Sequence, residues 1–229
     1  MSKIALLITM YISSTIERKK MYKLNILDWL NNTPFEIYTV DSSNRKLDII
    51  HPRLHQYYFD QGFNQINKNP SMSEKNSILR LFDNYPELYS YNFIYKITGK
   101  YYCPNFMDQY KTIPNNVDIV LQYGIKGKLN FYIIILSIIL LFIYLFINVN
   151  DIFIVILVLL KILPNEHTEL VGMKPQLLKD VVQSINYFNF EITLYNYINS
   201  HTDLLTYRLK PLQIKRKTMR SDKSILNIL

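Results

Sequence analysis

The feature that most constrains this chain is an apolar stretch from Leu129 to Asn150, which contains 22 residues without a formal charge. As an α-helix this stretch is about 33 Å long, enough to cross the ~30 Å hydrocarbon core of a bilayer. A helix on the surface of a soluble domain normally has a polar face, and this stretch has almost none. A second, shorter apolar run, Ile152–Leu160, follows closely. The sequence therefore predicts a transmembrane or re-entrant segment over residues 129–163, with membrane lipid as its partner.

Three arrangements of residues 129–163 are compatible with the sequence. A single crossing places the parts of the chain before and after it on opposite sides of the membrane, whereas a hairpin that turns near Asn150 keeps them together. The arms of such a hairpin are short for a full crossing each way, so it would be re-entrant or interfacial. The third arrangement is a translated insertion from an AT-rich genome, without an evolved role. Lysines flank the stretch on both sides and indicate no orientation.

The chain before the apolar stretch alternates between short apolar runs and amphipathic segments. Ile4–Ile12 is a continuous apolar run with β-branched members, which is typical of a strand buried on both faces. Apolar positions recur on one side of a predicted helix over residues 16–30, and Phe35–Val40 is a second predicted strand. This β-α-β order predicts an α/β fold with a mostly parallel sheet and flanking helices.

The remaining elements extend this pattern on both sides of the apolar stretch. Ser71 and Glu74 have the spacing of a capping box at the start of a helix. Leu47–Ile50 and Leu54–Phe59 are interpreted as short strands or turns. Further strands are predicted at Tyr91–Ile97 and Val117–Gln122, and helices over 71–82, 174–185 and 190–200. We therefore expect three segments: residues 1–128, one half of the α/β domain; residues 129–163, an apolar helical insertion; and residues 164–229, the rest of the domain with an acidic helix and a basic tail.

The charge distribution limits the classes of partner. The formal net charge is +8, and the basic residues are scattered apart from clusters at Arg18–Lys20 and Lys215–Lys217. Neither cluster is interleaved with aromatic residues at the spacing of a nucleic-acid motif. We interpret both as solvated faces and expect no nucleic-acid partner. The alternative, nucleic-acid binding by the basic tail, predicts a steep salt dependence of the affinity.

Cysteine and histidine usage limits metal and redox chemistry. Cys103 is the only cysteine, which excludes an internal disulfide and a thiolate zinc site and favours a reducing compartment. We expect it to be a small buried residue. His51 and His55 lie four residues apart, but Pro52 argues against the helix that would place them on one face. The sequence therefore predicts no metal site.

Residues 96–102, Lys-Ile-Thr-Gly-Lys-Tyr-Tyr, resemble the K-[IL]-[ST]-G-[RK]-Y segment of small nucleotide-sugar glycosyltransferase-like proteins from bacterial polysaccharide clusters and large DNA viruses. Other segments occur in the order of that family: Val40–Asn44, Ser71–Asn76, Asp118–Val120, Thr168–Met173 and Phe190–Ile198. The resemblance covers most of residues 3–122 and 166–215 and omits the apolar stretch. It implies an A-type glycosyltransferase fold in which residues 1–128 form the nucleotide-sugar-binding half.

In a doubly wound sheet, ligands bind at the carboxyl ends of the strands. The resemblance implies that Asp41 accepts a hydrogen bond from the nucleoside, that Gly99 lets the backbone approach the diphosphate, and that Lys100 neutralises its charge. An ordinary turn is the alternative for the Asp-Ser-Ser-Asn segment. Lys96 alternates with apolar residues and is expected to be a solvated or edge side chain. The predicted donor-binding residues are Asp41, Ser42, Ser43, Thr98, Gly99 and Lys100.

Inverting glycosyl transfer needs a carboxylate that accepts the proton of the acceptor hydroxyl. The resemblance implies Glu169 and Glu191 as candidates for this catalytic role. The alternatives are a surface residue at 169 and, at 191, an acid stabilised by the N-terminus of a helix. No Asp-x-Asp motif occurs, so the metal–diphosphate clamp of A-type enzymes is not visible and no metal or other cofactor is predicted. Lys100 is expected to offset the leaving-group charge in its place.

The sequence thus favours a membrane-associated glycosyltransferase, with its domain facing the cytoplasm, that transfers a sugar from a nucleotide-sugar donor. The alternative is a non-enzymatic, membrane-associated protein that retains a degenerate scaffold of this kind. The sequence does not specify the donor sugar, the acceptor, the linkage or the oligomeric state.

Overall fold

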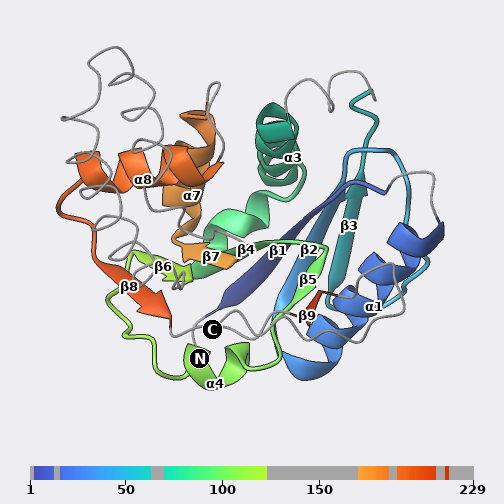
Figure 1. The fold of residues 1–229 in the computed structure, drawn as a ribbon, viewed down its shortest axis with the longest axis horizontal. Helices are drawn as coiled ribbons and strands as arrows, with labels where there is room; N and C mark the ends of the chain where they lie inside the picture. Colours follow the sequence, from blue (N-terminus) through green and yellow to red (C-terminus); the bar gives the residue numbers. More distant parts are fainter. Residues whose placement is uncertain are drawn as a thin grey trace, which may run out of the picture.

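The computed structural model describes residues 3–12, 16–62, 70–122, 170–185, 190–209 and 215–216. These ranges form a seven-stranded sheet with helices on both faces, and a separate two-stranded sheet (Figure 1). The predicted apolar insertion at 129–163 lies outside the described residues. Among the helices that are described, none has the length and apolar character needed to span a bilayer.

The predicted β-α-β opening is confirmed. Its first four elements are β1 (Ile4–Met10), α1 (Ile16–Asn32), β2 (Glu36–Asp41) and β3 (Leu54–Tyr58). Every residue of β1 is buried, because this strand lies inside the sheet with helices on both of its faces. β1 and β2 pair in parallel, with Leu6 opposite Ile37, and β3 pairs in parallel with β2.

The elements after β3 complete the sheet and its two helical layers. In chain order the elements are α3 (Pro70–Asn84), η1 (Pro86–Ser90), β4 (Phe93–Thr98), β5 (Tyr101–Tyr102), α4 (Phe106–Tyr110), β6 (Ile119–Gln122), β7 (Leu170–Met173), α7 (Pro175–Gln183), α8 (Phe190–Ser200), β8 (Thr206–Leu209) and β9 (Lys215–Arg216). The strands β7 and β8 were not predicted from the sequence.

The strand order is β3-β2-β1-β4-β7-β6-β8, and the sheet is mostly parallel, as predicted. Only β7 runs antiparallel to its neighbours, β4 and β6. The chain builds β1, β2 and β3 in one direction and then returns to place β4 on the other side of β1. This reversal produces a topological switch point between β1 and β4, at the carboxyl ends of those strands.

The parts of the chain before and after residues 123–169 share this sheet. β6 comes from the first part, and its neighbours β7 and β8 come from the second. The pairing of β6 with β7 therefore places residues from both parts of the chain side by side in one sheet.

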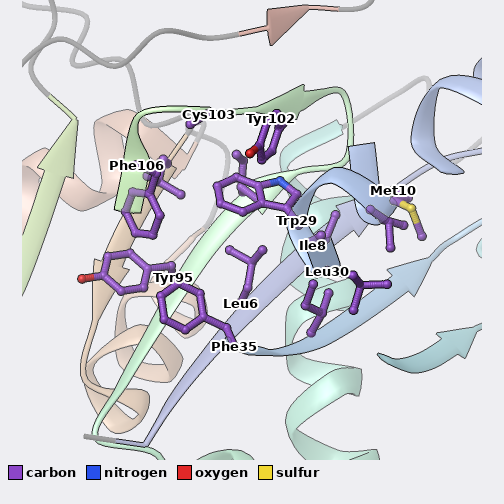
Figure 2. Close-up of a cluster of buried hydrophobic side chains, with 14 of the residues drawn as sticks. Leu6, Ile8, Met10, Trp29, Leu30, Phe35, Tyr95, Tyr102, Cys103 and Phe106 are labelled. Carbon is purple, nitrogen blue, oxygen red and sulfur yellow. The ribbon is translucent and has the colours of Figure 1, made fainter. Parts of the chain in front are cut away.

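Two hydrophobic clusters hold the helices against the sheet. Helices α1 and α4 cover one face, and α3, α7 and α8 cover the other (Figure 1). In the first cluster, the Trp29 ring meets Tyr102 and Phe106 edge-on, with ring centres 5.0 and 5.8 Å apart (Figure 2). Cys103 lies in the same cluster and is 1% exposed, which confirms the expectation of a buried residue.

Candidate functional site

The carboxyl ends of β2, β1 and β4 bring the two predicted donor-binding segments together. In the sheet register, Met10 of β1 lies opposite Asp41 of β2, and Thr9 lies opposite Thr98 of β4. A cavity of about 240 Å³ opens at this edge, between α1 and α3. It is lined by Thr9, Met10, Tyr11, Tyr22, Ser42, Ser73, Glu74, Ser77, Thr98 and Lys100.

The Asp41 carboxylate organises the loops at the end of β2. The side chain is buried, and its Oδ2 accepts a 2.7 Å hydrogen bond from the Ile12 backbone amide. Its Oδ1 accepts hydrogen bonds from the Ser43 and Arg45 backbone amides, at 2.9 and 3.0 Å. Asp41 thus ties the loop after β1 to the loop after β2. The proposed contact between Asp41 and a nucleoside remains a prediction.

The two serines after Asp41 have different environments. The Ser42 side chain is buried and lines the cavity, and its backbone amide donates to the Met10 carbonyl at 3.3 Å. The Ser43 hydroxyl lies 2.7 Å from the Ile12 carbonyl oxygen and 2.6 Å from Asp41 Oδ1. Ser43 therefore supports the same turn as Asp41, whereas Ser42 belongs to the wall of the cavity.

Helix α1 fixes the turn that follows β4. The Asn25 side-chain amide donates to the Gly99 carbonyl at 2.9 Å, and the Trp29 indole donates to the Tyr101 carbonyl at 3.2 Å. A Cβ atom at Gly99 would lie 2.7 Å from Met10 Cγ and 3.0 Å from the Tyr22 ring. The absence of a side chain at Gly99 therefore allows α1 and β1 to pack closely against the turn.

Three polar groups at this edge are suited to ligand binding. The Thr98 hydroxyl oxygen is buried and has no hydrogen-bond partner within the described part of the chain, which is rare for a buried polar atom. Lys100 contributes a cation to the wall of the cavity. Tyr22 also lines it, donating to the Tyr11 carbonyl at 3.2 Å, and burial raises the pKa of this phenol.

Glu74 and Lys96 form an ion pair beside the cavity that the sequence did not predict. Lys96 Nζ lies 2.7 Å from Glu74 Oε1, and Lys96 is only 2% exposed, so the expectation of a solvated or edge side chain was wrong. The capping-box interpretation was also wrong. Helix α3 begins at Pro70, which places Ser71 inside the helix, and Glu74 binds Lys96 instead of the helix start. The tertiary packing of α3 on β4 provides this charge partner.

The two predicted catalytic glutamates differ in what the structure describes. Glu169 lies outside the described residues. Glu191 is the second residue of α8, directly after Phe190, but the structure does not describe its side chain. The Lys96 ammonium lies over the Phe190 ring, with Nζ 4.5 Å from the ring centre. The N-terminus of α8 is therefore on the same face of the sheet as Glu74.

The histidines considered for metal binding have other partners. His55 lies on β3, where its Nε2 is 2.9 Å from Glu36 Oε2 and its ring stacks on Tyr38. His51 accepts a hydrogen bond from the Arg53 backbone amide. No cluster of three or more metal-ligating side chains occurs within the described ranges.

A larger cavity, of about 420 Å³, lies at the opposite edge of the sheet. It is lined by the starts of β1 and β4 and by the segment before β6, including Ile4, Phe93, Tyr95, Lys111 and Val117. None of the predicted site residues lines this cavity. Volume alone therefore does not identify the candidate site.

No family model and no curated protein sequence matches the chain. One similar solved structure is a Desulfovibrio desulfuricans G20 protein assigned as a nucleotide-diphospho-sugar transferase, with 10% identity and a TM-score of 0.48, covering 92% of this chain and 81% of that one. Another is a glycosyltransferase involved in glycosylation of the major capsid of PBCV-1, with 9% identity, a TM-score of 0.48 and coverages of 90% and 80%.

A third similar structure is the bifunctional IspDF from Campylobacter jejuni, with 9% identity and a TM-score of 0.48. The alignment covers 91% of this chain and 50% of that protein. Similarity at this level does not extend to activity.

Proposed function

We propose that this chain is a glycosyltransferase that binds a nucleotide-sugar donor at the carboxyl edge of β2, β1 and β4. The observation that carries the proposal is the position of the cavity at the topological switch point between β1 and β4, where α/β sheets bind their ligands. The Thr98 hydroxyl, which has no hydrogen-bond partner among the described residues, and the Lys100 cation line this cavity and are suited to a diphosphate.

The described cavity accommodates part of such a donor. Its 240 Å³ is below the range of about 300–1,000 Å³ typical of pockets for drug-sized ligands. We assign the diphosphate to the Thr98–Lys100 turn and the nucleoside to the Asp41–Ser43 side. Because no Asp-x-Asp motif is present, we propose that Lys100 offsets the charge of the leaving nucleoside diphosphate without a metal ion.

We further propose that the protein acts at a membrane. Residues 129–163 are apolar, and the segment that contains them joins β6 and β7 at Gln122 and Leu170. Since Leu170 lies opposite Ile97 near the end of β4, both attachment points are at the edge of the sheet that carries the cavity. A membrane-bound segment would hold this edge towards the lipid surface. Co-sedimentation with lipid vesicles, with and without residues 129–163, tests the proposal.

Calorimetric titration of the full chain with a panel of nucleotide-sugars tests donor binding. We expect one donor to bind and Lys100→Ala to weaken it by about tenfold or more, since hydrogen bonds to charged groups contribute about 1.5–3 kcal/mol. Lys111→Ala is the matched control, because it removes the same charge from the opposite edge of the sheet. If no nucleotide-sugar binds the folded protein, the non-enzymatic scaffold becomes the better interpretation.

A further inference from the structure

The Glu74–Lys96 pair joins four elements at one side of the cavity. Lys96 comes from β4 and Glu74 from α3, and Thr9 of β1 donates its hydroxyl to Glu74 Oε1 at 3.2 Å. Phe190, the first residue of α8, covers the Lys96 ammonium. A buried ammonium is strongly unfavourable unless it is paired, so this arrangement holds the Glu74 carboxylate in one position.

The two oxygens of Glu74 have different roles. Oε1 binds both Lys96 and Thr9, whereas Oε2 has no partner among the described residues. The Glu74 side chain is 21% exposed and lines the cavity, although Lys96 beneath it is almost fully buried. One oxygen is therefore anchored in the protein, and the carboxylate retains the capacity to accept further hydrogen bonds from a ligand.

The chemistry of the cavity indicates what Glu74 binds. An ionised carboxylate accepts hydrogen bonds and donates none, so it is suited to hydroxyl groups and repels phosphate. Lys100, in the same cavity, has the opposite preference. The cavity thus has a cationic part at the end of β4 and an anionic part on α3, which matches the diphosphate and the hydroxyl-rich ring of a nucleotide-sugar.

We propose that Glu74 binds hydroxyl groups of the transferred sugar and that Lys96 is the positioning residue that holds it. This inference depends on the proposed donor binding and adds the subsite for the sugar ring. Glu74 would then contribute to the choice between a nucleotide-sugar and the corresponding nucleoside diphosphate. The Thr98–Lys100 turn would contribute equally to the affinity for both.

The test compares the affinities of a nucleotide-sugar and its nucleoside diphosphate, using the donor found in the panel. Glu74→Gln keeps the size of the side chain but removes the charge, and we expect the preference for the nucleotide-sugar to fall about tenfold or more. Affinity for the nucleoside diphosphate alone should stay within about threefold. Glu36→Gln is the matched control, since it removes a carboxylate at the amino end of β2, where Glu36 Oε2 lies 2.9 Å from His55 Nε2.

Two further measurements keep the test decisive. Glu74→Gln leaves the Lys96 ammonium without its partner, so the double variant with Lys96→Met removes both charges and should fold with the same loss of preference. Lys96→Met alone should reduce the preference by a smaller factor. An unchanged preference in folded Glu74 variants would overturn this inference but leave donor binding intact. If Glu74→Gln reduces the preference for the nucleotide-sugar only when Mg²⁺ is present, and EDTA abolishes this effect, then Glu74 binds a cation. That outcome would also overturn the inference.

Discussion

Val120 of β6 and Gly172 of β7 are antiparallel partners in the central sheet, although residues 123–169 separate their strands in the sequence. The pairing continues to Leu121 and Val171, next to the points where the chain leaves and re-enters the described structure. Strands that end and begin side by side in this way have the geometry of a β-hairpin, in which a few residues suffice as a connection.

We therefore predict that residues 123–169 can be replaced by a short loop such as Asn-Gly between Gln122 and Leu170. The shortened chain should unfold cooperatively, because the β6–β7 pairing and both hydrophobic clusters are retained. Circular dichroism during heating measures the cooperativity of unfolding of the shortened chain. Aggregation, or loss of the cooperative transition, would show that the replaced segment belongs to the folded core.

Gly172 is a position where we predict that any side chain destabilises the fold. A Cβ atom there would lie 2.4 Å from Tyr95 Cε1 and 2.5 Å from Phe93 Cε1, so both aromatic rings would have to move. Gly172→Ala should lower the free energy of unfolding by roughly 1–3 kcal/mol, the usual effect of overpacking a core. Urea titration provides the value, and an unchanged midpoint would contradict the close packing of Gly172 against these rings.

Asp118 should make stability depend on pH in the acidic range. Its Oδ1 lies 2.5 Å from Lys174 Nζ and its Oδ2 accepts a hydrogen bond from the Leu205 amide at 2.9 Å. The hydrogen bond from Lys174, followed by that from Leu205, lowers the pKa of the Asp118 carboxyl. A lowered pKa in the folded state means that the carboxylate stabilises the protein above its unfolded-state pKa, and that this contribution is lost as pH falls through the folded-state pKa.

Asp118→Asn should therefore reduce the free energy of unfolding by roughly 1 kcal/mol at pH 7. The difference from the wild-type protein should be constant from pH 7 to about pH 5 and should shrink below about pH 4. Urea titrations at several pH values measure both curves. Parallel curves down to pH 3 would show that the Lys174 and Leu205 contacts do not stabilise the ionised form.

Substitutions at Asp41 and Lys100 should differ in their effect on the free energy of unfolding. Asp41→Asn replaces a buried carboxylate that accepts hydrogen bonds from the Ile12, Ser43 and Arg45 amides, so it should lower the free energy of unfolding by about 2–3 kcal/mol. Lys100→Ala should change stability by less than about 1 kcal/mol. Thermal unfolding of both variants measures the contrast, and a more stable Asp41→Asn than Lys100→Ala would contradict it.

Much of the fold was predictable because its signals are local. The apolar run of β1, the helical periodicity of α1 and the second apolar run at β2 specify a parallel β-α-β unit without any knowledge of the rest of the chain. The strands β7 and β8 lacked such signals. Each has four residues, and each is stabilised by pairing with a neighbour distant in sequence.

The candidate site was predictable only in part. Its loops follow β2 and β4, and parallel strands place such loops at one edge of the sheet, so the proximity of Asp41 and Thr98 to β1 could be expected. The environment of each side chain could not be predicted from the sequence. Lys96 has the alternating position of an exposed residue, and only the packing of α3 and α8 on β4 makes it a buried ion pair.

The alternation of strands and helices follows from the amino-acid sequence alone, as do the burial of β1 and the chemical groups available after β2 and β4, because these depend on neighbouring residues along the chain. Long-range packing, in contrast, specifies which distant segments pair, that the two parts of the chain share one sheet, and that Glu74 faces Lys96. These contacts arise from the packing of helices on the sheet, which depends on the shapes and charges of residues far apart in the sequence.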